Sequence, residues 1–239
     1  SHSVNMNRIP VIDLFAGPGG LGEGFSRACE TQCYRLALSV EMDQYAYQTL
    51  ELRAFLREFP SSMYPQEYYD FLRGAVGREE LFRLYPVEAK RARDEVWRAE
   101  LGNSASAPTE EVDRRVRTAI GNTDQWVLIG GPPCQAYSTV GRSRNLGNPS
   151  YDAVQDHRHF LYREYLRIVR EHQPAAFVME NVPGILSARL PDRSARRDRW
   201  MKIFPLILSD LRSAGTSSSE PYHLVPVVPS DDHSLARFV

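Results

Sequence analysis

One cysteine and one glutamate each stand just beyond a short apolar run, where a buried strand of a parallel sheet would end. Cys134 follows the run 126–129, and Glu180 directly follows the run 175–179. The carboxyl ends of parallel strands meet at one sheet edge, which is where ligands bind. A thiolate there can attack an electron-poor carbon, and a carboxylic acid can assist by donating a proton. The sequence predicts a covalent catalytic site; the alternatives are Cys134 as a small buried side chain and Glu180 as a cap.

A glycine-rich turn follows the first apolar run of the chain, residues 9–15. Glycines at 17, 19 and 20 let the backbone turn tightly and approach a ligand, and the helix expected to about residue 30 would point its amino terminus at that ligand. Glu41 ends the second predicted strand, at the spacing from the turn that suits an acid binding a ribose diol. These features predict a nucleotide-type cofactor. The alternatives are a tight turn without a ligand and, for Asp43, a helix amino-cap.

The elements that would hold these residues read as strands alternating with helices, which predicts an α/β fold with a mostly parallel sheet. Residues 44 to about 120 favour helix apart from a loop over 102–108, and we expect a helical insertion over about 55–121 with a solvated surface. Thr109 is the expected amino-cap of its last helix, and 157–172 have helical apolar spacing. The basic segment 189–202 fits a phosphate patch or a solvated helix face, and 222–228 fit a last edge strand.

A polar loop follows the cysteine, over residues 139–151. A loop beside a nucleophile often closes over the site, and its Arg142 and Arg144 are suited to contact phosphates. Simple solvation of the loop is the alternative.

The composition is that of a globular protein, because 42% of the 239 residues are hydrophobic and 25% are charged. No apolar run approaches the roughly 18 residues of a membrane span, and no secretory signal is visible. The net charge of −1 provides no general attraction to nucleic acid, so such binding must come from local patches. Cys29, Cys33 and Cys134 make neither a disulfide framework nor a zinc pattern, and we expect a cytoplasmic protein without a metal site.

Taken together, three stretches resemble motifs of the cytosine-C5 methyltransferases, in the same order and spacing. Residues 13–20 with Gly24 and Phe25 are similar to the cofactor motif, 131–135 to the nucleophile motif, and 180–182 to the acid motif. The matching segments span residues 9–186. The resemblance implies a Rossmann-like, S-adenosylmethionine-dependent methyltransferase fold with helices on both faces of the sheet.

The resemblance also implies the site residues. Those expected to bind S-adenosyl-L-methionine are Phe15, Ala16, Gly17, Gly19, Gly20, Leu21, Glu41, Met42 and Leu161. Those expected to be catalytic are Cys134, Glu180, Asn181 and Pro133. Those expected to contact DNA are Gln135, Ser138, Arg142 and Arg144.

The implied reaction is methyl transfer to C5 of a cytosine that is flipped out of double-stranded DNA. Cys134 would add to C6 while Glu180 relieves the charge at N3, because C5 alone is a poor nucleophile. Two alternatives stay open: a cytosine-C5 methyltransferase acting on RNA such as tRNA, and a non-catalytic cofactor- or DNA-binding domain of the same fold. A modification system would also imply a restriction endonuclease partner.

The sequence departs from the family pattern at several points. Trp126 stands where an aspartate is usual, the acidic residue that would contact adenine after the third strand cannot be placed, and no Gln-x-Arg-x-Arg string occurs. The target-recognition region and the C-terminal motifs are not found. We therefore expect residues 1–239 to be one catalytic domain of an incomplete enzyme, with little or no activity alone.

Overall fold

The computed structural model of the protein describes residues 8–31, 33–60, 63–132, 161–180, 185, 189–191, 200–215 and 221–226. The chain divides into two compact units. The first contains residues 1–131 and 174–179, and the second contains residues 132–173 and 180–239. The first unit carries the sheet and the glycine turn.

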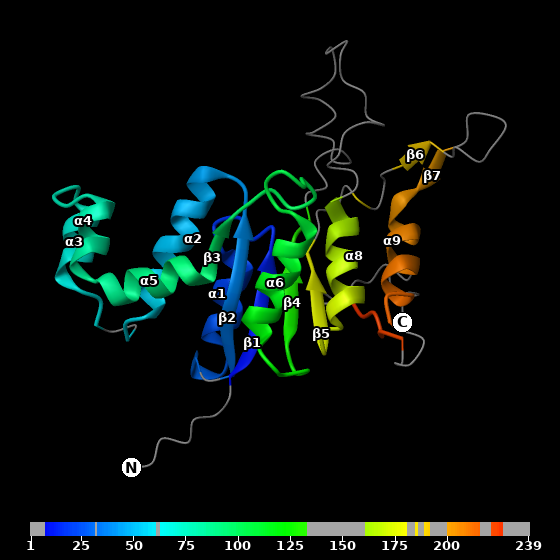
Figure 1. Ribbon diagram of the computed structural model, residues 1–239, viewed down its shortest axis with the longest axis horizontal. Helices are drawn as coiled ribbons and strands as arrows, with labels where there is room; N and C mark the ends of the chain where they lie inside the picture. Colours follow the sequence, from blue (N-terminus) through cyan, green and yellow to red (C-terminus); the bar gives the residue numbers. More distant parts are fainter. Residues whose placement is uncertain are drawn as a thin grey trace, which may run out of the picture. The chain divides into compact units, whose positions relative to one another are not determined.

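A five-stranded, fully parallel sheet is the centre of the first unit (Figure 1). Its strands, in spatial order, are β3 (Val96–Arg98), β2 (Tyr34–Glu41), β1 (Ile9–Leu14), β4 (Val127–Gly130) and β5 (Ala176–Met179). Strands β1 and β4 are buried along nearly their whole length, as expected for parallel strands covered on both faces. The prediction of an α/β fold with a parallel sheet is confirmed.

Helices cover both faces of this sheet. The connections from β1 to β2 and from β2 to β3 run toward one edge of the sheet, and the connection from β3 to β4 runs back toward the other edge. Because such connections are right-handed, the helices of the two directions lie on opposite faces. Figure 1 shows α1 (Gly20–Arg27) behind the sheet and α6 (Thr109–Ile120) in front of it. Strand β2 ends at Glu41 as predicted, whereas α1 ends at Arg27, about three residues before the predicted end.

Four helices form a lobe beside the edge strand β3 (Figure 1). They are α2 (Gln44–Arg57), α3 (Gln66–Leu72), α4 (Arg78–Leu84) and α5 (Pro86–Glu95). Phe55 of α2 stacks on Phe82 of α4 with ring centroids 4.8 Å apart. The buried Glu51 forms an ion pair with Arg78, so the lobe has both an apolar and a charged internal contact.

In the stretch 44–120, the expectation of helix before the loop at 102–108 was wrong at β3. Val96, Trp97 and Arg98 form a sheet strand directly after α5, although strong helix formers precede them. Strand pairing with Ser39–Glu41 decides the outcome, because β-branched and aromatic side chains suit a half-buried sheet position. The last helix of the stretch also begins differently, since Pro108 occupies the amino-cap position and Thr109 is the first helical residue.

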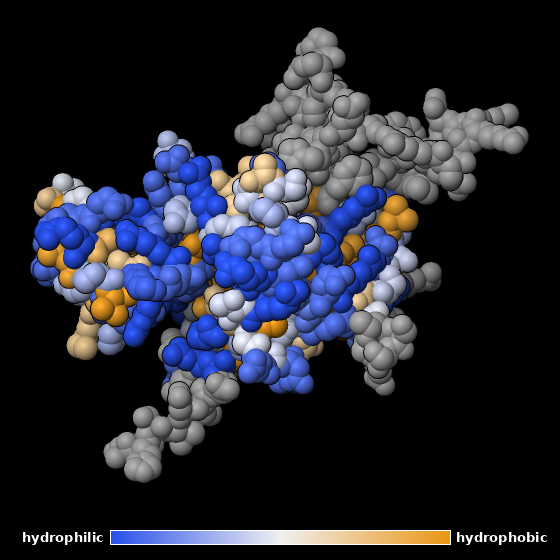
Figure 2. All heavy atoms as spheres, viewed as in Figure 1, coloured by the Kyte–Doolittle hydropathy of each residue, from blue (hydrophilic) through white to orange (hydrophobic). Residues whose placement is uncertain are grey.

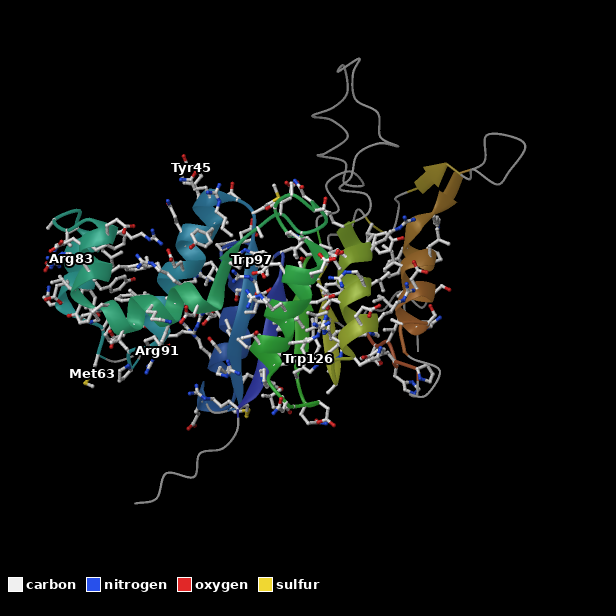
Figure 3. The ribbon with its side chains drawn as sticks, viewed as in Figure 1. Tyr45, Met63, Arg83, Arg91, Trp97 and Trp126 are labelled. Carbon is white, nitrogen blue, oxygen red and sulfur yellow. A yellow bond between two sulfur atoms is a disulfide. The ribbon has the colours of Figure 1, made fainter. Side chains whose placement is uncertain are left out.

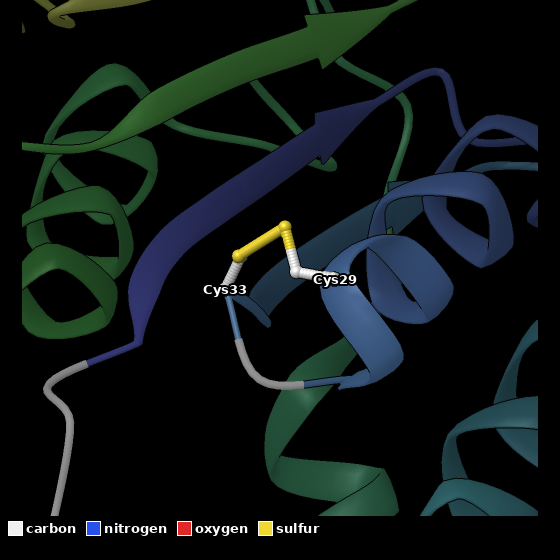
Figure 4. Close-up of a disulfide and its surroundings, with 2 residues drawn as sticks. All are labelled: Cys29 and Cys33. Atoms are coloured by element: carbon white, nitrogen blue, oxygen red, sulfur yellow. A yellow bond between two sulfur atoms is a disulfide. The ribbon is translucent and has the colours of Figure 1, made fainter.

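A disulfide joins Cys29 and Cys33 (Figure 4), which corrects the expectation that the cysteines form no disulfide. Cys29 belongs to a short 3-10 segment, Ala28–Thr31, in which Cys29 and Glu30 adopt positive φ angles. Cys33 immediately precedes β2, and its carbonyl accepts a hydrogen bond of 2.9 Å from the Ile9 N–H. The sequence could not predict this bridge, because one pair of cysteines four residues apart lacks the repeated spacing that marks a disulfide framework.

The described part of the second unit contains two helices, α8 (Leu161–His172) and α9 (Ile203–Arg212), and a short antiparallel pair, β6 (Arg189–Pro191) and β7 (Trp200–Lys202). Both ends of the basic segment 189–202 are therefore strands, which corrects the helix-face interpretation. Residues 221–226 form no regular structure, so the predicted last strand is wrong over 222–226, and 227–228 lie outside the described residues. No helix among the described residues is both long and apolar enough to span a membrane.

Candidate cofactor and active site

The glycine turn between β1 and α1 is built from left-handed backbone conformations. Phe15, Gly17 and Gly19 have φ angles of 57°, 56° and 85°. Glycine adopts such angles at little cost, whereas Phe15 is an uncommon example among larger residues. The Gly19 N–H donates to the Ala16 carbonyl at 2.9 Å and closes the turn. A Cβ added at Gly17 or Gly20 would meet no atom within 4 Å, so the turn is open on the side where a ligand would approach.

Two glycines fix helix α1 and the turn against neighbouring elements. A Cβ at Gly19 would lie 2.6 Å from Leu50 of α2, and a Cβ at Gly22 would lie 2.9 Å from Leu36 of β2. Larger residues would therefore push the turn away from α2 and α1 away from the sheet. Leu21 adds to this packing, because its side chain lies against the buried cluster around Val11 and Ile129.

Glu41 joins the glycine turn to the end of β2. One carboxylate oxygen accepts the Gly17 N–H at 2.7 Å, and the other accepts the Asp43 N–H at 2.7 Å. A carboxylate has about four acceptor positions, so two positions remain for a ligand. The structure thus brings together two residues, Gly17 and Glu41, that the sequence predicted as parts of one cofactor site.

Asp43 is the amino-cap of α2, as predicted. Its carboxylate accepts the N–H groups of Tyr45 and Ala46 at 2.9 and 2.8 Å. The neighbouring Met42 is 53% exposed and Tyr45 is 78% exposed, and Figure 3 shows Tyr45 pointing away from α2. Apolar side chains are therefore available to a ligand beside Glu41.

Asp13 is a buried acid of β1 to which the sequence analysis assigned no role. Its side chain is 1% exposed, and its oxygens make no hydrogen bond to any residue that the structure describes. Burial raises the pKa of Asp13 to about 7, although the nearby Gly22 N–H and the Arg57 guanidinium act in the opposite direction. The signal in the sequence was an acid inside an otherwise apolar strand.

Arg57 at the end of α2 lies between two carboxylates. It forms ion pairs with Glu23 of α1 and with Glu95 of α5, the latter at 2.5 Å. Burial raises the pKa of Glu95 to about 7 despite the attraction of Arg57. This bridge ties together the three helices α1, α2 and α5.

The identification of β3 also supplies a candidate, Glu100, for the acidic residue that the sequence analysis could not place. Glu100 follows the strand by two residues, at the same sheet edge as Glu41, since the Ala99 N–H donates to the Glu41 carbonyl at 3.1 Å.

Trp97 of β3 (Figure 3) lies under the Arg115 guanidinium, which is 4.4 Å from the ring centroid. This contact anchors α6 to the edge strand.

The three strands that precede the predicted reactive groups end at one level. Leu14 of β1 pairs with Gly130 of β4, and Gly130 pairs with Met179 of β5. The glycine turn follows β1 and Glu180 follows β5 directly, while Cys134 lies four residues beyond the end of β4 in the sequence. The strand ends therefore fulfil the geometric condition on which the predicted site depends.

Several predicted site residues lie outside the described residues, namely Pro133, Cys134, Gln135, Ser138, Arg142, Arg144 and Asn181. Leu161 is the first residue of α8 and is buried, and Glu180 is exposed. Both belong to the second unit.

A helix-flanked, fully parallel sheet with a glycine turn after β1 and an acid after β2 defines a Rossmann-like methyltransferase fold. The family model for the C-5 cytosine-specific DNA methylases matches residues 85–222, more than half of the chain. The chain belongs to this family.

Curated relatives agree with this assignment. A type II methyltransferase of Bacillus paralicheniformis is 37% identical over 194 residues, which cover 75% of this chain and 42% of the relative. A putative type II methyltransferase of Methanocaldococcus jannaschii is 31% identical over 192 residues, covering 74% of this chain and 49% of the relative. A DNA (cytosine-5-)-methyltransferase of Aeropyrum pernix is 35% identical over 103 residues, covering 39% of this chain and 21% of the relative. The chain thus spans less than half the length of these relatives.

Proposed function

We propose that the protein transfers a methyl group from S-adenosyl-L-methionine to C5 of cytosine in DNA, with Cys134 as the nucleophile. The observation that carries the proposal is the common level at which β1, β4 and β5 end. It supports a single site to which the glycine turn, Cys134 and Glu180 all contribute, because ligands of parallel sheets bind at this edge. Family membership independently favours this chemistry.

The cofactor would be held by residues of the first unit. The open turn at Gly17 and Gly20 leaves space for a ligand, and the two remaining acceptor positions of Glu41 match the two hydroxyls of a ribose. Met42 would pack against the base, and Glu100 would accept from its amino group. When bound, S-adenosylmethionine supplies the electrophilic methyl group.

The protein's own residues would make C5 reactive. The Cys134 Sγ thiolate attacks C6 and forms an S–C bond, while the Glu180 carboxylic acid protonates N3. The resulting enamine is nucleophilic at C5, which accepts the methyl group. A base then removes the C5 proton, and the S–C bond breaks as Cys134 leaves. Asn181 and Pro133 would orient the Cys134 thiolate and the Glu180 carboxyl group.

The substrate would be double-stranded DNA from which the target cytosine is flipped, because C6 is inaccessible to a thiolate inside the base stack. We propose that Gln135, Ser138, Arg142 and Arg144 contact this DNA. We propose a cytoplasmic modification enzyme with a partner restriction endonuclease, and the type II methyltransferase names of the relatives support the modification role.

Trapping with 5-fluorocytosine tests the mechanism, because fluorine at C5 cannot leave as a proton. In the complete enzyme, mixed-sequence duplexes carrying this base should form a stable adduct at Cys134, detected by peptide mass spectrometry in the presence of S-adenosylmethionine. Cys134→Ser should abolish the adduct, whereas the matched variant with both Cys29→Ser and Cys33→Ser should retain it. An adduct at another residue, or a preference for tRNA over duplex DNA, would contradict the proposal.

A further inference from the structure

The outer edge of β2 has a strand partner over only part of its length. Strand β3 pairs with Ser39–Glu41, and no described residue pairs with 34–38 on that side. The Cys33 carbonyl faces β1, where it accepts from Ile9, so the alternation of a strand turns the backbone groups of Tyr34 and Leu36 toward the outer edge. A short row of ladder positions is therefore left open. The row is short because β2 has a bulge: one additional residue stands between the partners of Val11 and Ile12 and interrupts the regular alternation.

A groove of about 940 Å³ lies along this open edge. Its floor includes Tyr34–Leu38, and its walls come from α1, the end of α2, α5 and α6. Thr118 and Ala119 of α6 line one side, while Phe59 and Leu56 provide apolar surface on another. Figure 3 shows Arg91 on the side of α5 away from Tyr45, so this groove lies toward the amino ends of the strands and away from the glycine turn.

The lining of the groove carries an excess of positive charge. Seven of its side chains are arginines and four are carboxylates, which gives a formal excess of three positive charges. Arg8 and Arg35 are exposed, and Arg35 donates to the Ala119 carbonyl at 3.3 Å without an ion pair to any carboxylate that the structure describes. Hydrophilic residues dominate the surface of α6 in Figure 2. An acidic ligand is therefore favoured over a basic one.

We propose that this groove binds an extended acidic peptide segment of a partner protein, which adds a strand to the open edge of β2. The backbone N–H and C=O groups of the peptide would pair with those of Tyr34 and Leu36, and its acidic side chains would meet Arg8 and Arg35. Two observations select this ligand, namely the unpaired strand edge and the excess positive charge. A nucleic acid would be attracted by the positive charge, but it has no peptide backbone to form ladder hydrogen bonds with the open edge of β2.

The probe is a fluorescently labelled peptide of alternating valine and glutamate, tested on the full 239-residue chain by anisotropy. Two matched peptides separate the contributions: one has N-methyl groups at alternate residues, and the other has lysine in place of glutamate. We expect binding of the first peptide only. Hydrogen exchange in the segment 34–38 should slow when it binds, because its open amides become hydrogen-bonded.

Protein variants locate the site. Arg35→Glu, and independently Arg8→Glu, should weaken binding about fivefold, the effect expected for one exposed charge contact. Arg83→Glu, on the far side of the lobe (Figure 3), is the matched control and should bind normally. The proposal is overturned by equal binding of the N-methyl peptide or by no binding at millimolar peptide. If duplex DNA binds with the same dependence on Arg35, the edge is a nucleic-acid site and the proposal is wrong. If Arg35→Glu dissociates dimers of the chain, the edge is an interface between two copies, which also overturns the proposal.

Discussion

At the scale of single residues, the site depends on carboxylates whose surroundings give them different tasks. Glu41 is partly exposed, accepts two backbone N–H groups and retains acceptor positions for a ligand. Asp13, in the neighbouring strand β1, is buried and has a pKa raised to about 7. Exposure therefore leaves Glu41 accessible to the proposed ligand, whereas the buried Asp13 is inaccessible.

Glu41→Ala should weaken binding of S-adenosylmethionine by about 1–3 kcal/mol, because a ribose hydroxyl loses its acceptor and the Gly17 N–H loses its partner. Titration calorimetry on the chain gives the affinity directly. Glu79→Ala, at an exposed position of the lobe, is the matched control. Unchanged affinity of the Glu41 variant would remove this residue from the cofactor site.

The residue types and spacing predicted Glu41 as a cofactor ligand and Asp43 as a cap, because both functions follow from a position at the end of a strand, and the role of Glu41 stays a prediction. The hydrogen bond of Asp43 confirms the cap. The raised pKa of Asp13 could not be predicted, since it depends on complete burial and on the helices that pack over β1. Glu100 could not be assigned either, because its position relative to the sheet depends on β3.

At the scale of elements, long patterns gave reliable predictions and short segments did not. Strands β1, β2, β4 and β5 each coincide with an apolar run, and α8 has the predicted helical spacing. Strand β3 contains three residues in a run rich in arginine and glutamate, so local propensity favoured helix. Its pairing with β2 is a tertiary contact, which cannot be predicted from the local sequence.

The two helix starts provide a direct comparison. Asp43→Ala should lower the free energy of unfolding by about 1 kcal/mol, because the Tyr45 and Ala46 N–H groups lose their acceptor. Thr109→Ala should change it by no more than a few tenths of a kcal/mol, since α6 has no side-chain cap. Urea unfolding of both variants measures the difference. Equal losses would contradict the assignment of Asp43 as the functional cap.

The disulfide at the end of α1 should also contribute to stability. Replacing both Cys29 and Cys33 by serine should cost about 2 kcal/mol in the chain-entropy description, because the loop between them is short. Thermal unfolding without reductant measures this loss, and a reducing agent should lower the stability of the wild type to that of the double variant. If reductant has no effect on the wild type, the bridge does not form in solution.

At the scale of the whole molecule, the sequence predicted the parallel sheet but neither its strand β3 nor the division of the chain into two units. The glycine turn, the acid after β2 and the two later strand ends were placed correctly relative to the sheet. The two compact units were not foreseen, because their boundaries cut the chain three times without any linker composition to mark them. The open edge of β2 likewise follows from the shortness of β3 and has no local signal.

The two acids with raised pKa values make stability depend on pH. Asp13 and Glu95 both have a pKa of about 7 in the folded protein, against ordinary values of 3.8 and 4.5. The folded state therefore binds more protons than the unfolded state between about pH 4 and pH 7. Their favourable contribution is complete below the ordinary values and is lost as the pH rises through 7.

We expect the free energy of unfolding to fall between pH 5 and pH 8, with Asp13 accounting for on the order of 2–3 kcal/mol. Asp13→Asn keeps the shape of the side chain without the ionisation, so this variant should be more stable than the wild type at pH 8 and less dependent on pH. Asp70→Asn, on the exposed α3, is the matched control and should retain the slope of the wild type. Urea unfolding at several pH values measures each curve. A stability that rises from pH 5 to pH 8 in the wild type, or an equal slope in Asp13→Asn, would show that Asp13 ionises without cost in the folded protein.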